Sequence, residues 1–292
     1  MILVAGSANL DFVVRAPHIP AAGETVMGSA FMTYAGGKGA NQAIACAKAG
    51  GAETAMLLAL GNDMHSAPIE ASLRTAGVRM HIVRIGDRAT GTAFICVADD
   101  AQNAITVAPG ANYSLDAQHL PPLDGVTHLL MQLEIPLQTV VAYATAAKSR
   151  GVKVVLNAAP AQSLPAELLA LLDVLIVNEG ELAAITGCGV DVEQGLRRLA
   201  VPCVVVTLGE RGCLARHDGR WISQKGFSVE AVDTTAAGDT FCGVLTAGLD
   251  KGIELPEALR NACAAGALAC TKAGAQSSIP SSEQVQALLE GS

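Results

Sequence analysis

The sequence lacks several features that mark common classes of protein. Its 292 residues include 27 Asp and Glu against 19 Lys and Arg, which gives a formal net charge of −8 and no basic stripe. A nucleic acid or an anionic membrane is therefore not expected as a partner, because no basic stripe could neutralise its phosphates. No uninterrupted apolar stretch of about 18 residues occurs, so no transmembrane helix is predicted.

Signals for disulfides and metals are also missing. The eight cysteines include no C-x-x-C pair, and the six histidines show no metal-ligand spacing. Most cysteines have apolar neighbours, as expected for small core residues in a reducing, cytoplasmic location. Cys263 and Cys270 could share a helix face, where packing is favoured over metal binding. Residues 1–5 are apolar without a preceding basic segment, so a buried strand is expected there instead of a signal peptide.

Short apolar strands alternate with helical segments through most of the chain. Strands are predicted at 127–133, 152–156 and 174–177, with helices at 137–148 and 165–172 between them. This alternation is typical of βαβ units around a parallel sheet that is covered on both faces. The expected fold is α/β, a Rossmann-like three-layer α/β/α sandwich. The length fits one domain with an insertion as well as two domains.

Two regions interrupt this pattern. Residues 10–35 and 90–109 lack helical periodicity and are predicted as β segments, the second as a hairpin around residues 99–103. Sheet segments inserted into an α/β core often form a lid over a site. The alternative is an edge extension of the main sheet.

Residues 233–240 carry the clearest chemical signal. Small residues precede the apolar run 241–249, so the backbone N–H groups at the start of a helix can point at an anion such as a phosphate. Asp239 in the same turn would repel a phosphate. Its presence makes sense if it takes a proton from a hydroxyl that attacks the phosphorus, as in a kinase. The alternative is that Asp239 is an N-cap and Gly238 a turn residue.

A second glycine-rich segment lies at residues 36–42, ahead of a helical stretch at 43–49 that Gly50 and Gly51 would end. It is not a Walker A loop, because Gly39 follows Lys38 where Ser or Thr is required. It also lacks the third glycine of a dinucleotide fingerprint. The spacing alone indicates only that the backbone closely approaches something small and polar.

Together these segments resemble the ribokinase-like carbohydrate kinases of the phosphofructokinase B type. The resemblance runs nearly the full length, and Ala236 departs from it where many members carry glycine. It implies a single domain over 1–292, with lid insertions near 10–35 and 90–109 that pair between subunits in a homodimer. The other matching segments are 6–11, 23–25, 131–134, 157–161, 178–181, 207–212 and 274–280.

The resemblance implies ATP-dependent phosphorylation of a sugar hydroxyl, with conversion of D-ribose to D-ribose 5-phosphate expected first. Deoxyribose, fructose or a nucleoside such as adenosine stay open, because one lid side chain, for instance Ala93, Phe94 or Ile95, can set specificity. A silent sugar- or nucleotide-binding regulator is disfavoured by the intact Asp239. A nicotinamide dehydrogenase is disfavoured by the missing glycine fingerprint.

The resemblance also assigns roles to residues. Asp239 is the expected catalytic base, beside an anion hole formed by Ala236, Ala237 and Gly238. The expected sugar contacts are Asn9, Asp11, Gly37, Lys38, Gly39, Ala40, Asn41, Glu134 and Asp239. The expected nucleotide contacts are Asn178, Thr207, Leu208, Gly209, Glu210, Arg211, Gly212, Gly238 and Cys263.

Two metal ions are implied in the same way. Asn178 and Glu181 match an N-x-x-E motif that acts through Mg²⁺ and its waters, although a helix N-cap with a first-turn acid fits the local sequence too. A monovalent cation, K⁺, is expected to be held largely by backbone oxygens, with Lys272 contributing its carbonyl. The matching residues are Asp233, Thr235, Ala269, Lys272, Gly274 and Ser278.

Overall fold

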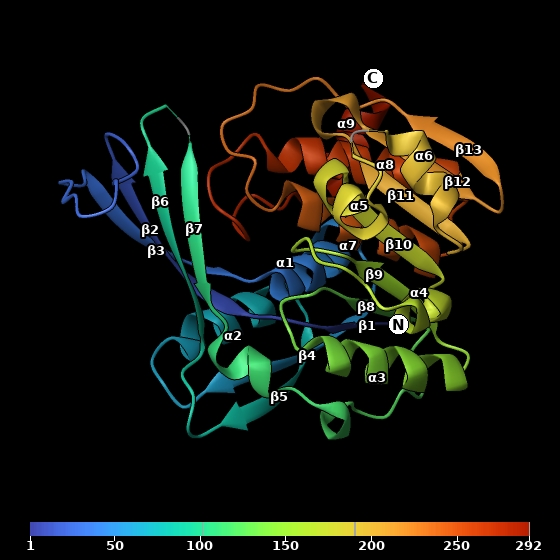
Figure 1. The fold of residues 1–292 in the computed structure, drawn as a ribbon, viewed down its shortest axis with the longest axis horizontal. Helices are drawn as coiled ribbons and strands as arrows, with labels where there is room; N and C mark the ends of the chain where they lie inside the picture. The colour runs from blue at the N-terminus through green and yellow to red at the C-terminus, as the bar shows by residue number, and fades with distance from the viewer. Residues whose placement is uncertain (101, 190, 292) are drawn as a thin grey trace.

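A computed structural model describes residues 1–100, 102–189 and 191–291. Within them, nine strands form a central sheet in the spatial order β13-β12-β11-β10-β9-β8-β1-β4-β5 (Figure 1). All pairings are parallel except those that β12 makes with β11 and β13. The strands are β1 (Ile2–Ala5), β4 (Thr54–Gly61), β5 (Arg79–Ile85), β8 (His128–Met131), β9 (Lys153–Asn157), β10 (Val174–Asn178), β11 (Cys203–Thr207), β12 (Cys213–His217) and β13 (Arg220–Gln224).

Helices cover both faces of this sheet. In β1, Ile2 and Val4 face one hydrophobic cluster, whereas Leu3 and Ala5 face the other. This all-apolar strand is typical of a sheet buried on both sides. The first cluster includes α1 (Lys38–Ile44), α2 (Ser66–Thr75), α7 (Ala237–Asp250), α8 (Leu255–Ala269) and α9 (Ser282–Glu290). The second includes α3 (Leu137–Ser149), α4 (Ala166–Leu171), α5 (Glu179–Thr186) and α6 (Val192–Arg198). The predicted three-layer α/β/α fold is confirmed.

A second, smaller sheet projects from this body (Figure 1). It consists of β2 (Asn9–Ala16), β3 (Ala30–Gly36), β6 (Gly91–Ala98) and β7 (Asn103–Ala108), in the order β3-β2-β6-β7. The alternative of an edge extension of the main sheet is wrong, because these strands pair only with one another in the described part of the chain. β6 and β7 pair antiparallel, as the predicted hairpin requires. Ala101, within the predicted turn, lies outside the described residues.

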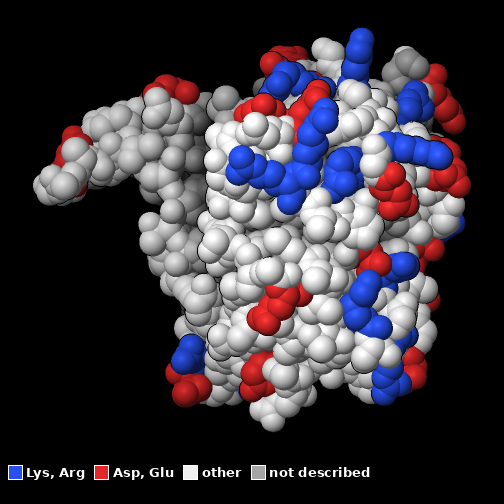
Figure 2. All heavy atoms as spheres, turned by 45° about the vertical axis from the view of Figure 1, so that its right-hand side comes forward, with Lys and Arg blue, Asp and Glu red and all other residues white. Residues whose placement is uncertain are grey.

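Charged side chains of both signs lie on the face that Figure 2 presents. Basic side chains gather toward the top of this face, with acidic side chains around and among them. Among the described residues, no helix has both the length and the apolar character needed to cross a membrane.

The parallel strands bring polar residues to one edge of the central sheet. β1, β8, β9, β10 and β11 run in the same direction, so their carboxyl ends lie together. Ligands of open α/β sheets bind at this edge. The residues at or just after these strand ends are Ser7, Glu134, Asn157, Asn178 and Thr207.

Candidate active site

The first side of the site is the start of α1. This helix begins at Lys38, so the expectation that helical structure starts at residue 43 is wrong, and it passes into a π-helical turn over Ala45–Ala49. Its N-cap, Gly37, has φ 88°, and a Cβ there would lie 2.7 Å from the amide nitrogen of Asn9. Only glycine permits both the conformation and the close approach.

The expected sugar contacts Asn9, Asp11 and Asn41 are buried together with Asp239. Nδ2 of Asn41 donates to Oδ2 of Asp239 at 2.9 Å, which joins α1 to α7. Nδ2 of Asn112 donates to Oδ1 of Asn9 at 2.8 Å and so fixes the orientation of that side chain. Hydrogen bonds therefore fix Asn9 and Asn41, and the charge of Asp239 acts on Asp11.

Glu134 lies beside these side chains and is held from two sides. Its Oε2 accepts a hydrogen bond from the Ser7 hydroxyl at 2.5 Å and from the backbone N–H of Lys38 at 3.2 Å. A carboxylate with these two donors is fixed in place and is not a freely solvated group. Its position after β8 thus links the carboxyl edge of the sheet to the start of α1.

The site concentrates negative charge. Burial raises the pKa of Asp11 to about 7, and the nearby carboxylates of Glu134 and Asp239 add to the shift. The only cation among the expected sugar contacts is Lys38, whose pKa is raised chiefly by Asp239 and further by Glu134, against the opposing effect of burial. Its ammonium group therefore offsets part of the repulsion between the carboxylates.

The second side of the site is the start of α7. Ala236 is the N-cap, with φ 60° and ψ 7°, and Asp239 is the third residue of the helix. The alternative of Asp239 as an N-cap is therefore wrong. The first amides of a helix have no intrahelical acceptor, so those of Gly238 and Asp239 are available to an anion. The carboxylate and these amides share one helical turn.

A cavity of about 830 Å³ opens next to this turn. Thr207, the residues from Gly209 to Gly212, Gly238 and Cys263 line it, so most of the expected nucleotide contacts meet there. Asn178 and Leu208 are not among its lining residues. Its apolar walls include Phe227, Val229 and Phe241, which could not be predicted because no sequence motif marks them.

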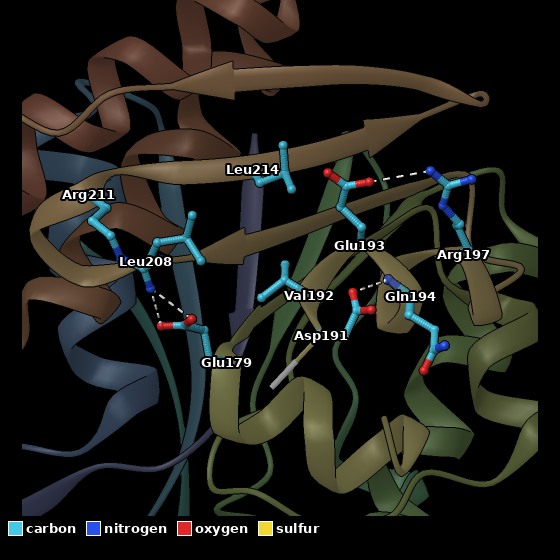
Figure 3. A pocket seen from close by; sticks show the side chains of 9 residues that line it. All are labelled: Glu179, Asp191, Val192, Glu193, Gln194, Arg197, Leu208, Arg211 and Leu214. Atoms are coloured by element: carbon cyan, nitrogen blue, oxygen red, sulfur yellow. Dashed lines mark hydrogen bonds and ion pairs between the residues drawn. The ribbon is translucent and has the colours of Figure 1, made fainter. Parts of the chain in front are cut away.

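Leu208 instead lines a second hollow of about 750 Å³, on another side of the same loop (Figure 3). Four of the charged side chains of this hollow form ion pairs, and the fifth, Asp191, caps α6 by accepting from the backbone N–H of Gln194. Nη2 of Arg211 lies 2.7 Å from both carboxylate oxygens of Glu179, and Arg197 pairs with Glu193. These ion pairs satisfy groups that could otherwise recognise a ligand, so the cavity beside α7 is the better candidate.

Asn178 and Glu181 form a capping box at the start of α5. Oδ1 of Asn178 accepts from the backbone N–H of Glu181, and Oε2 of Glu181 accepts from that of Asn178, both at 2.8 Å. The helix-cap alternative therefore describes what these side chains do. It does not conflict with a magnesium role, since Glu181 is a buried carboxylate whose charge acts on Lys38. Mg²⁺ needs few protein carboxylates and keeps several waters.

Asp233 ties together the two segments expected to hold a monovalent cation. Its Oδ1 accepts from the N–H and the hydroxyl of Thr235, at 2.9 and 2.6 Å, and its Oδ2 accepts from the N–H of Gly274 at 2.9 Å. Ala269 and Ser278, which flank Gly274 in the sequence, are buried, and the side chain of Lys272 is exposed. The segments meet close behind the start of α7, with carbonyl and hydroxyl oxygens of the kind that such a cation binds.

Several polar residues of the site were not assigned a role from the sequence. Gln42, Gln132 and Asn157 lie in the matching segments, yet no role was predicted for them. They form hydrogen bonds behind Asp239. A usable signal exists for two of them, because Gln132 follows β8 directly and Asn157 ends β9, where a polar side chain is unusual after a buried apolar strand.

Comparisons with known proteins identify the family of the chain. Residues 1–282 match the family described as pfkB family carbohydrate kinase. The chain is 40% identical to a ribokinase of Haemophilus influenzae, over 99% of this chain and 98% of that protein. It is 32% identical to a deoxyribokinase of Salmonella typhi, over 99% and 98%. A solved structure of Arabidopsis thaliana ribokinase complexed with ribose and ATP superposes with a TM-score of 0.91 at 33% identity, covering 100% of this chain and 99% of that one. The chain therefore belongs to the pfkB family of carbohydrate kinases and is a sugar kinase.

Proposed function

We propose that this protein transfers the γ-phosphoryl group of ATP to D-ribose, forming ribose 5-phosphate, with Asp239 as the catalytic base. The observation that carries the proposal is the position of Asp239. Its carboxylate accepts a hydrogen bond from the buried side chain of Asn41 on α1, while Gly238, one residue earlier, lines the cavity of about 830 Å³. A sugar hydroxyl and a terminal phosphate would meet at this one turn of α7.

The chemistry follows from these placements. The Asp239 carboxylate accepts the proton of the sugar hydroxyl as its oxygen attacks the γ-phosphorus. The amides at the start of α7 stabilise the negative charge that develops on the transferred group. Because both sets of groups are fixed by the fold before substrate binds, little reorganisation is needed in the transition state.

The polar set suits a polyol. Asn9 and Asn41 present amides that donate and accept, and Asp11 and Glu134 present carboxylates that accept. The relatives named above act on ribose and on deoxyribose, so deoxyribose is the second candidate substrate. Ala93 pairs with Asp11 in register and shares its face of the small sheet, whereas Phe94 pairs with Phe12 on the opposite face. Ile95 shares the face of Ala93 but pairs with Val13, so Ala93 is the lid side chain directly beside Asp11 and the one that we assign to sugar specificity.

Magnesium and potassium complete the proposal. The carboxylate of Glu181 and the side chain of Asn178 fit a Mg²⁺ held mostly by water and phosphate, which would neutralise charge on the nucleotide. The two segments tied by Asp233 would hold K⁺ through backbone oxygens and the Ser278 hydroxyl. A cation there would favour the conformation in which the amides of α7 face the phosphate.

We assign the small sheet as a lid that also pairs two copies of the chain into a homodimer. One face of the sheet carries Asp11. The other face carries a row of aromatic side chains, in which the ring of Phe12 lies 5.4 Å from that of Phe94 and 6.1 Å from that of Phe31. Phe31 is 65% exposed and Phe94 is 54% exposed, and burial in a second copy would remove this apolar surface from water. Replacing Phe94 with Asp should shift the mass measured by light scattering from dimer to monomer.

The experiment that tests the function is ADP release from Mg·ATP with ribose, deoxyribose, fructose or adenosine, each in potassium and in sodium. Turnover on ribose that increases with potassium would support the proposal. Preference for deoxyribose would transfer the specificity to the second candidate and point to Ala93. Equal rates in both salts would contradict only the proposed potassium site and would leave the proposed reaction standing. No turnover by folded, ATP-binding protein would contradict the proposed reaction.

A further inference from the structure

A chain of side-chain amides lies behind the proposed base. Nε2 of Gln42 donates to Oδ1 of Asp239 at 2.9 Å and to Oδ1 of Asn157 at 3.0 Å. Oε1 of Gln42 accepts from Nε2 of Gln132 at 2.6 Å. Gln42 and Gln132 are both 0% exposed, so these bonds are made away from water, where an unmade bond is costly.

The orientation of the Gln42 amide is set at both ends. Asn157 donates its own Nδ2 to the carbonyl oxygen of Ile176 at 3.2 Å, so its Oδ1 faces Gln42. Gln132 presents its NH₂ group to the other end of Gln42. Only one of the two amide orientations of Gln42 satisfies these neighbours, and that orientation aims an N–H at Asp239.

The sequence leaves room for this arrangement at Gly6. A Cβ at that position would lie 1.9 Å from Oε1 of Gln132. Any larger residue in the turn after β1 would displace Gln132 and, through it, Gln42. The chain of amides is thus built into the carboxyl edge of the sheet.

We propose that Gln42 is a positioning residue for the reaction: its amide fixes the Asp239 carboxylate and stabilises the ionised form without exchanging a proton with it. This inference rests on the proposed function. A carboxylate has about four lone-pair directions, and Asn41 and Gln42 occupy one on each oxygen. The directions that are left are open to the sugar hydroxyl.

Neutral amides suit this position better than an ionisable side chain would. An amide does not gain or lose a proton at neutral pH, so the proton that Asp239 accepts stays on Asp239 until it leaves toward the sugar side. A carboxylate in place of Gln42 would repel the ionised base and raise its pKa.

The charge of Asp239 acts on four titratable groups around it, and each of them lies on a different element. They are Asp11 on β2, Lys38 on α1, Glu181 on α5 and Cys242 on α7, with Glu134 acting on Asp11 and Lys38. Changes at Gln42 leave all of them in place. A shift measured relative to the unaltered protein therefore reports on the amide and not on these groups.

The test compares Gln42→Met and Gln42→Glu with the unaltered protein in two measurements. The first is the pKa of Asp239 from carboxyl NMR of protein labelled with ¹³C-aspartate, assigned with Asp239→Asn. The second is the pH profile of kcat at saturating ribose and Mg·ATP. In Gln42→Met the pKa and the acidic limb should both move up by about one pH unit, because one hydrogen bond to the ionised carboxylate is lost. In Gln42→Glu the shift should be larger.

Thr246→Val is the matched control. Thr246 lies on α7 and, like Gln42, is fully buried. Its hydroxyl donates to the carbonyl oxygen of Cys242 at 2.8 Å, so the change removes a buried hydrogen bond that does not involve Asp239. It should lower thermal stability and leave the pKa and the limb unmoved. If Gln42→Met does not fold, Gln132→Met, which frees only the far end of Gln42, should give a smaller shift in the same direction.

An unmoved Asp239 pKa in folded Gln42→Met, or an equal shift in Thr246→Val, would overturn the inference. The NMR measurement needs no turnover. Failure of the proposed reaction would appear as absent ADP release in the unaltered protein, with the effect of Gln42 on the carboxylate still decided by the NMR titration.

Discussion

Asn41 and Asp239 are 198 residues apart in the sequence, yet Nδ2 of the first donates to Oδ2 of the second at 2.9 Å. This bond joins the glycine-rich start of α1 to the start of α7, which is built from small residues. Each helix start alone has an ordinary structural explanation as a turn. Their contact places a buried carboxylate between the proposed sugar contacts and the cavity of about 830 Å³.

Replacing Asp239 with Asn should separate binding from turnover. The amide has nearly the same shape as the carboxylate, so the sugar pocket and the cavity should remain, but it cannot accept the proton of the hydroxyl. Loss of a general base costs about 10²- to 10⁴-fold in rate. We expect kcat to fall in that range, with the calorimetric affinity for ADP changed by less than about twofold. A variant with near-normal turnover would show that another group is the base.

Asp11 should make stability depend on pH in a defined direction. Its pKa is raised from an ordinary value of 3.8 to about 7 in the folded protein. Between these values the native state keeps a proton that the unfolded chain releases. The contribution of Asp11 to stability is therefore complete below about pH 4 and is lost as the pH rises through 7.

Asp11→Asn removes this dependence. At about 1.4 kcal/mol per pKa unit, the variant should gain roughly 2–4 kcal/mol over the unaltered protein between pH 4 and pH 8. Urea unfolding at both pH values measures the difference, and equal gains at the two would contradict the raised pKa. The same change should weaken sugar binding, because it replaces an acceptor that we assign to the sugar.

Ala236→Gly should stabilise the protein. Ala236 has φ 60°, a left-handed conformation that costs an alanine about 1–2 kcal/mol and a glycine almost nothing. After the entropy that glycine adds to the unfolded chain, a net gain of about 0.5–1 kcal/mol is expected in chemical unfolding. Ala184→Gly, at an exposed right-handed position of α5, should instead lose about 1 kcal/mol.

Cys263 should control access to the nucleotide cavity. Its side chain lines that cavity and lies 3.7 Å, sulfur to sulfur, from the buried Cys213. Cys263→Phe would fill space that the nucleotide needs, so KM for ATP should rise by about tenfold or more while KM for the sugar changes little. Cys263→Ala keeps the space open and should leave both constants nearly unchanged. A parallel rise in both KM values for Cys263→Phe would indicate a general distortion.

Asp233→Ala should abolish the distinction between potassium and sodium. The carboxylate holds Thr235 and Gly274 together, and without it the two segments proposed to bind the cation separate. We expect lower turnover that no longer responds to potassium, with ADP binding retained. Thr271→Ala, which removes a local hydroxyl bond to Leu268 in the same loop, serves as the control and should keep its potassium response.

The alternation of apolar strands and helices was enough to predict the architecture, and residues 127–177 show why. The predicted elements there match β8, α3, β9, α4 and β10 to within a few residues. Short buried strands and amphipathic helices have local patterns of apolar residues, and these patterns can be recognised without knowledge of the tertiary contacts. The start of α1 was misplaced for the opposite reason. Gly37 and Gly39 have low helix preference. The hydrogen bonds that hold the start of the helix come from Glu134 and Ser7, which are remote in sequence.

The candidate site could be predicted as a set of residues but not as a network. Motifs located Asn41, Glu134 and Asp239, because chemistry restricts which residue types can do their work. Gln42 carries no such signal, since a buried glutamine is recognised only by what it contacts. The left-handed backbone of Ala236 could not be predicted either, because alanine rarely adopts this conformation.

The composition of the pocket from distant segments has a consequence for biosynthesis. The residues proposed to contact the sugar, up to Glu134, leave the ribosome long before Asp239. Helix α7, which carries the proposed base and packs on α1, follows only after the greater part of the chain. A growing chain therefore cannot be stabilised by bound sugar or nucleotide until α7 has emerged and docked. Cellular sugar can protect the finished enzyme from unfolding, but it cannot guide the first half of its synthesis.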